Sequence, residues 1–149
     1  MARFYRYDLL FAVDHLSRFL TKWTVACDKK LKRLVAYLNC TETTALRSVV
    51  GDDLSKCFLA IFSDADFAGS LLDSKSTSGC FVAIVGPNTF APLTAICKTQ
   101  TCVSHSSTES EIVALDFALR TEGLPLLMLI QHLTGGIYDS SKRGKGNCV

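Results

Sequence analysis

The sequence has 149 residues, a formal net charge of +2, 48% hydrophobic residues and 20% charged residues. This length accommodates one domain with at most a small appendage, and the composition is that of a globular chain rather than a disordered one. The net charge is too small to indicate nucleic-acid binding by itself. The seven cysteines are odd in number and form no Cys-x-x-Cys pair, which argues against a disulfide framework and a zinc ribbon.

The sequence shows no pattern of a signal peptide or of a membrane span. Arg3, Arg6 and Asp8 interrupt the start of the chain, and no apolar core with a cleavage site follows them. The longest apolar stretch, residues 124–130, is far too short to cross a bilayer. We therefore expect an intracellular protein, cytoplasmic or nuclear, with reduced cysteines and no membrane span.

Residues 8–38 predict two amphipathic helices in an antiparallel hairpin. Apolar residues recur at helical spacing over 9–20 and again over 27–38, with a break at 21–24. A basic cluster occupies mostly the other face of the second helix: Lys29, Lys30, Lys32 and Arg33. Such a cluster is either a solvated helix face or a site that contacts nucleic acid. We expect the hairpin to span 1–47 and a polar linker to span 48–57.

Short apolar runs then predict an antiparallel meander of three strands. The runs cover residues 57–63 and 79–85, with a third strand within 92–103, and turn residues separate them. Ser106 and Glu109 match a capping box, which predicts a helix from that point. Gly123 and Pro125 are expected to break this helix, and a second short helix is expected to begin at Pro125 and end near 133. The predicted fold class is therefore α/β, more narrowly α+β.

Four acidic side chains are candidates for metal chemistry. Asp64 and Asp66 close the first predicted strand, whereas Glu109 and Glu111 lie in the first turn of the helix. Carboxylates from a strand end and an adjacent helix can converge on Mg²⁺, which prefers oxygen ligands, and two such ions about 4 Å apart support phosphodiester cleavage. The alternative is structural, because aspartates form turns and glutamates favour the first turn of a helix.

Four motifs in the same order and at similar spacing resemble copia-type retrotransposon polyproteins. They are Ser-Asp-Ala-Asp-Phe-Ala-Gly at 63–69, Asp-Ser-Lys-Ser-Thr-Ser-Gly at 73–79, Lys-Thr-Gln-Thr at 98–101 and Ser-Ser-Thr-Glu-Ser-Glu at 106–111, followed by Val-Ala-Leu at 113–115. The segments Asp-Leu-Leu-Phe-Ala-Val at 8–13 and Leu-Lys-Arg-Leu-Val-Ala-Tyr-Leu at 31–38 resemble the family's end of reverse transcriptase. The resemblance covers nearly everything from 8 to 133.

The resemblance implies a ribonuclease H fold and Mg²⁺-dependent cleavage of RNA in RNA–DNA hybrids. Asp64 matches the first catalytic aspartate and metal ligand, and Glu111 matches the catalytic glutamate and metal ligand. Asp66 and Glu109 would then support these ligands or play structural roles, Glu109 by capping the helix. The family's third catalytic aspartate lies on a later strand, and the only acidic residue after 133 is Asp139, in a polar, glycine-rich context.

The sequence therefore predicts a partial, truncated ribonuclease H-like domain over 58–133, followed by a flexible basic tail over 134–149. The tail carries Lys142, Arg143 and Lys145. Three hypotheses remain open. The chain could be a catalytically incomplete structural or interaction subunit, with the edge of the first strand open to a protein partner or to self-association. It could instead be a Mg²⁺-dependent hybrid nuclease, with little occupancy of the metal site, or a sequence-independent nucleic-acid binder.

Overall fold

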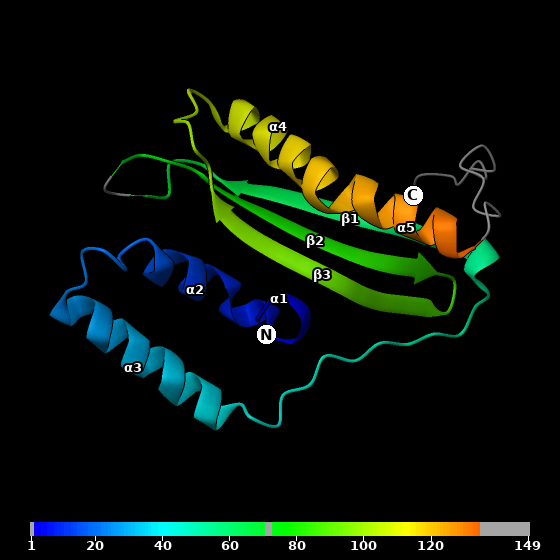
Figure 1. Ribbon diagram of the computed structural model, residues 1–149, viewed down its shortest axis with the longest axis horizontal. Coiled ribbons are helices and arrows are strands. Elements are labelled where there is room, and N and C mark those ends of the chain that lie inside the picture. Colours follow the sequence, from blue (N-terminus) through cyan, green and yellow to red (C-terminus); the bar gives the residue numbers. More distant parts are fainter. Residues whose placement is uncertain (1, 71–72, 135–149) are drawn as a thin grey trace.

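The computed structural model describes residues 2–70 and 73–134 as an α+β structure in which helices lie on both faces of one sheet (Figure 1). The helices are α1 (Ala2–Tyr5), α2 (Leu10–Ser17), α3 (Val25–Cys40), α4 (Ser107–Ala118) and α5 (Leu124–Leu133). Short 3₁₀ turns occupy Tyr7–Leu9 and Leu54–Lys56. The predicted fold class and the N-terminal helical segment are confirmed.

The sheet is the predicted antiparallel meander, in the order β1-β2-β3. Its strands are β1 (Phe58–Asp66), β2 (Thr77–Gly86) and β3 (Thr89–Thr99). Thr94 lies opposite Val82 and Pro92 opposite Ala83, so Leu93 is an extra residue in a bulge of β3. Proline cannot donate to a strand ladder and is tolerated at bulges and on edge strands, so Pro92 fits this position.

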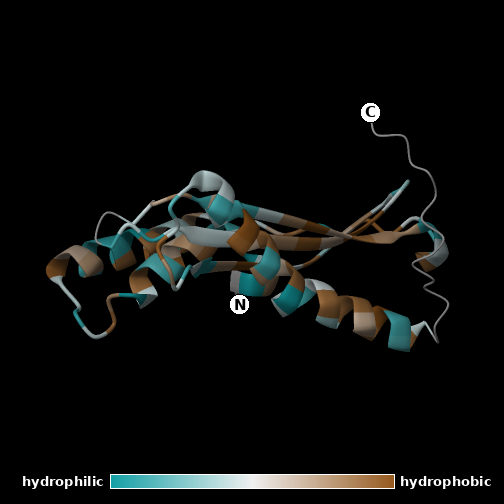
Figure 2. Cartoon of the chain, turned by 90° about the horizontal axis from the view of Figure 1, so that it is seen from above, coloured by the Kyte–Doolittle hydropathy of each residue, from teal (hydrophilic) through white to brown (hydrophobic). Residues whose placement is uncertain are grey.

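One face of the sheet packs against α4 and the segment that follows it. The core here consists of Cys80, Val82 and Ala118, with Leu59, Ile61 and Leu126 packed against it. These side chains are small, and Val82 is the largest side chain that is fully buried in the described part of the chain. Large apolar side chains of α5 remain exposed instead, and Figure 2 shows α5 as a largely hydrophobic helix: Leu124, Met128, Leu129 and Leu133.

The other face of the sheet packs against α1 and α2. The Tyr7 and Phe81 rings meet edge to face with centroids 5.6 Å apart, and Phe81 also contacts Phe62 and Phe90. Leu9 of the 3₁₀ turn and Leu16 of α2 are buried in this layer. α3 returns antiparallel to α2 and contacts it, as the predicted hairpin requires (Figure 1).

The predicted helix break at Gly123 and Pro125 is wrong. Residues Leu119–Gly123 form a π-helical turn, and the chain continues directly into α5. Pro125 lies in the first turn of α5, directly after this π turn, and its missing N–H removes one hydrogen bond from the continuous helix without ending it. Gly123 packs closely on β1, because a Cβ at this position would lie 2.5 Å from Cδ1 of Ile61.

The expected linker over 48–57 is attached to the turn between β2 and β3. Val49 forms an isolated bridge with Phe90, and the Asp52 carboxylate accepts hydrogen bonds from Asn88 N at 2.6 Å and Asn88 Nδ2 at 3.2 Å. These bonds, the backbone one first, lower the pKa of Asp52. Except for Thr134, the expected tail lies outside the described residues.

The prediction that no segment crosses a membrane agrees with the helices seen. Within 2–70 and 73–134, none combines the length and the apolar character that a bilayer span requires.

Candidate functional site

Asp64 and Asp66 lie at the end of β1, on the face that packs against α2. Asp66, Thr77 and Thr99 are paired across the three strands, so their side chains share one face of the sheet. The Thr99 hydroxyl donates to Asp14 Oδ2 of α2 at 3.1 Å, which identifies this face. Asp64 projects to the same face, because it lies two residues before Asp66 in a regular strand. Both aspartates are exposed.

Glu109 has the predicted role at the start of α4. The Ser106 hydroxyl accepts the Glu109 N–H at 3.1 Å, and the Glu109 carboxylate accepts the His105 N–H at 2.7 Å. The cap at Ser106 is confirmed, although the reciprocal bond goes to His105 rather than to Ser106 itself.

Glu111 lies on the exposed flank of α4 that faces the outer edge of β1. Ser110, Ala114 and Ala118 are buried against the sheet. Lys98 of β3 covers the Phe117 ring at 5.7 Å, so the Phe117 flank faces β3. Because successive helical residues are rotated by about 100°, Glu111 lies on the opposite flank.

The structure brings Asp64 and Glu111 to the same end of β1 but to opposite faces of the sheet. The Ser110 carbonyl is hydrogen-bonded through Gln100 to Ser78, which pairs with Ala65, so α4 begins level with the end of β1. No group of three His, Cys, Asp or Glu side chains that could hold a metal ion gathers within the described ranges. Cys97 shares a cross-strand row with Asp64, and burial raises the pKa of its thiol to about 11. Asp64 and Glu111 are two oxygen ligands, whereas a Mg²⁺ ion takes several, so a Mg²⁺ site at this end of β1 stays a prediction.

A buried polar network that sequence reasoning missed holds this end of the molecule together. Gln100 Nε2 donates to Ser78 Oγ at 3.0 Å and to the Ser110 carbonyl at 2.9 Å, while the Ser104 hydroxyl donates to Gln100 Oε1 at 3.1 Å. All four residues are buried. We call them the Gln100 network. Gln100, Ser78 and Ser110 come from three of the four motifs of the resemblance, so the motifs themselves were the available signal.

The turn after β1 is tied to the same network. Ser76 is fully buried, its hydroxyl accepts the Ala68 N–H at 3.1 Å, and its carbonyl accepts the Gln100 N–H at 2.8 Å. Ala68 has φ = 52°, a left-handed conformation that disfavours residues with a Cβ. The motif at 63–69 therefore joins the other three through the hydrogen bond of its Ala68 N–H to the Ser76 hydroxyl.

The four residues of the predicted basic cluster are all exposed on α3. Lys29 and Lys32 are exposed away from α2, whereas Lys30 and Arg33 line a pocket between α2 and α3. Lys30 Nζ lies 3.4 Å from His15 Nε2 and 5.9 Å from the centre of the Phe19 ring. Contact of these four cations with nucleic acid stays a prediction.

Comparisons with known proteins identify relatives among retrotransposon polyproteins. The retrovirus-related Pol polyproteins from transposons RE1 and RE2 of Arabidopsis thaliana are each 36% identical over 108 residues, or 72% of this chain. The chain spans only 7% of the length of these polyproteins. No family model and no solved structure matches the chain.

A third relative is much closer in size. The protein named secreted RxLR effector protein 161 of Plasmopara viticola is 34% identical over 113 residues, which are 76% of this chain and 75% of that protein. The chain therefore belongs to the same family as the Plasmopara viticola protein, and its sequence is of retrotransposon Pol polyprotein origin.

Proposed function

We propose that the chain is a copia-type, ribonuclease H-like module that acts as a structural or interaction subunit and does not cleave RNA–DNA hybrids by itself. The four motifs, the meander and the helix that follows it occur in the order that the resemblance implies. Asp64 and Glu111 on opposite faces of the sheet support catalytic incompleteness, because a two-metal site needs three or four convergent acidic residues. The effector-like relative, similar in length, supports a role for such a piece outside a polyprotein.

The observation that carries the proposed interaction is the outer edge of β1. β1 is the terminal strand of the sheet, and it pairs only with β2 among the described strands. Phe58 and Phe62 are each more than half exposed on one face of this strand. A long, apolar edge is a template for the addition of another strand.

The proposed occupant of this edge is β1 of a second copy, in antiparallel orientation. Pairing about Phe62 would place the exposed Phe62 rings of the two copies against each other and Ala60 opposite Asp64. Lys56 precedes the strand, whereas Asp64 and Asp66 close it. An antiparallel pair therefore brings the basic start of one strand near the acidic end of the other, and a parallel pair does not.

Self-association gives the first test. We expect the weight-average mass in sedimentation equilibrium to rise with concentration from the 16.3 kDa of the monomer toward about twice that value. The substitution Phe62→Lys should keep the chain monomeric, because it places a charge against its own copy at the centre of the pair. Phe90→Lys, at an exposed Phe on the same face of β3, is the matched control and should leave association intact. A mass independent of concentration contradicts the proposed edge pairing.

A hybrid cleavage assay gives the second test. With a labelled RNA–DNA hybrid in Mg²⁺, we expect no RNA cleavage above background, and the same result for Asp64→Asn and Glu111→Gln. Cleavage by the native chain that either substitution abolishes would establish the alternative function, a hybrid nuclease. The arrival of both carboxylates at the same end of β1 is the observation that favours this alternative.

A further inference from the structure

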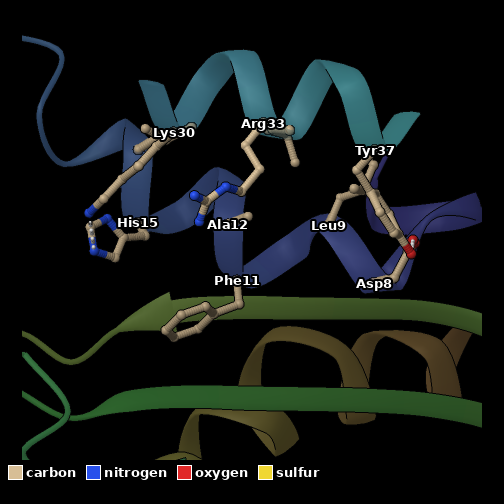
Figure 3. Close-up of a pocket in the computed structure, with 10 residues that line it drawn as sticks. Asp8, Leu9, Phe11, Ala12, His15, Lys30, Arg33 and Tyr37 are labelled. Atoms are coloured by element: carbon tan, nitrogen blue, oxygen red, sulfur yellow. Dashed lines mark hydrogen bonds between the residues drawn. The ribbon is translucent and has the colours of Figure 1, made fainter. Parts of the chain in front are cut away.

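A pocket of about 420 Å³ lies between α2 and α3, away from Asp64 and Glu111 (Figure 3). Its lining is largely apolar and also includes charged side chains. The lining residues are Asp8, Leu9, Phe11, Ala12, His15, Leu16, Lys30, Arg33, Leu34 and Tyr37. This volume is in the range of pockets that hold small molecules. Each lining residue comes from the helical hairpin or from the 3₁₀ turn before it.

The negative charge at one end of the pocket is already compensated. Asp8 accepts hydrogen bonds from Arg6 Nε at 3.1 Å, from Arg6 Nη2 at 2.9 Å and from the Tyr37 hydroxyl at 2.8 Å. The Arg6 bonds are the main reason why the pKa of Asp8 is lowered, so this carboxylate stays ionised and paired. It therefore offers little attraction to a cationic ligand.

The positive charges at the other end are not compensated. Lys30 and Arg33 both reach from α3 toward α2 (Figure 3), and neither has a carboxylate partner among the residues that the structure describes. Lys30 lies beside His15 Nε2, and His15 Nδ1 is buried with no hydrogen-bond partner. Two cations next to an apolar surface are complementary to a carboxylate on an apolar chain.

We propose that this pocket binds a small monocarboxylate that carries an apolar chain. The carboxylate would lie between Lys30 and Arg33, and the chain would cover the apolar lining formed by Leu9, Leu16 and Leu34. The apolar lining disfavours a nucleotide, whose sugar and phosphates need several polar partners. The uncompensated cations disfavour a neutral ligand, because binding it would desolvate them without a counter-ion.

Octanoate is the probe for a calorimetric titration of the full chain, with 1-octanol as the ligand of equal chain length that lacks the carboxylate. We expect saturable binding of octanoate, and binding of octanol weaker by about tenfold or more. The paired substitution Lys30→Met and Arg33→Met keeps the apolar stems and removes both charges, so it should weaken octanoate binding by about tenfold or more.

The matched control is Lys29→Met with Lys32→Met, which removes the same charge from the outer surface of the same helix. This variant should bind octanoate as the native chain does. Three results overturn the proposal: no saturable octanoate binding, equal affinity for octanol, or equal weakening by the two paired substitutions. Circular dichroism of each variant confirms that α2 and α3 remain folded, and none of these outcomes depends on self-association or on hybrid cleavage.

Discussion

Replacing Gln100 with alanine is expected to lower the free energy of unfolding by about 3 kcal/mol. The substitution removes three hydrogen bonds at once, and it leaves the buried hydroxyls of Ser78 and Ser104 without their partner. Buried polar groups without partners each cost about 1–3 kcal/mol, and the residue itself is only 7% exposed. Urea unfolding followed by circular dichroism measures the change.

The position of Gln100 also predicts where the structure loosens. Its side chain connects β2 to the first turn of α4, so its loss should speed amide exchange in 107–111 more than in α5. Gln131→Ala is the matched control, because Gln131 is partly exposed and should change the stability by less than about 0.5 kcal/mol. A loss below about 1 kcal/mol for Gln100→Ala would show that the network does not hold α4 in place.

The elements of the fold could be predicted from local sequence patterns. Apolar runs bounded by turn residues located the three strands, and Ser106 with Glu109 located the start of α4. These signals are short-range, since an apolar run and a helix cap each involve residues within a few positions of one another. The π turn at Leu119–Gly123 was missed because Gly and Pro have the same local signature in a break as in a continued helix.

The relation between the candidate catalytic residues could not be predicted in the same way. Which face Asp64 occupies depends on the register of β1 against β2, and a shift by one residue would move its side chain to the other face. The flank of α4 that carries Glu111 depends on which residues pack against the sheet, here Ser110, Ala114 and Ala118. Both are long-range features, so the spacing of the motifs carries no information about them.

The face of α3 that is turned toward α2 could not be predicted from local sequence patterns either. The periodicity predicted that Leu31 and Val35 belong to the buried face, but both are more than 40% exposed, and the face toward α2 carries Lys30 and Tyr37. α3 packs mainly against α2, and its Tyr37 also donates to Asp8 of the 3₁₀ turn, so little apolar surface is available to bury its leucines. The cationic pocket is a consequence of this orientation, and no local pattern in the sequence indicates it.

Arg3 forms an ion pair that joins the N-terminus of the chain to the π turn. It pairs with Glu122, and its Nε donates to the Thr94 hydroxyl of β3 at 3.2 Å. The Glu122 side chain is only 9% exposed, whereas that of Arg3 is 47% exposed. A buried carboxylate that loses its cation is strongly destabilising. The pair therefore holds α1 beside β3 and the π turn, although the desolvation of Glu122 offsets part of this stabilisation.

Arg3→Ala is therefore expected to lower the free energy of unfolding by about 2 kcal/mol, less than for a fully buried pair because solvent screens the exposed Arg3. Most of this loss should come from the charge left on Glu122, so adding Glu122→Gln to Arg3→Ala should restore part of the stability. Arg120→Ala, which breaks the exposed pair with Asp116, is the control and should cost at most about 0.5 kcal/mol. Denaturant unfolding of the four chains, with the native chain as reference, separates these terms. If the double substitution were no more stable than Arg3→Ala alone, the loss would arise from the Thr94 contact or from the packing of α1, and not from an unpaired charge.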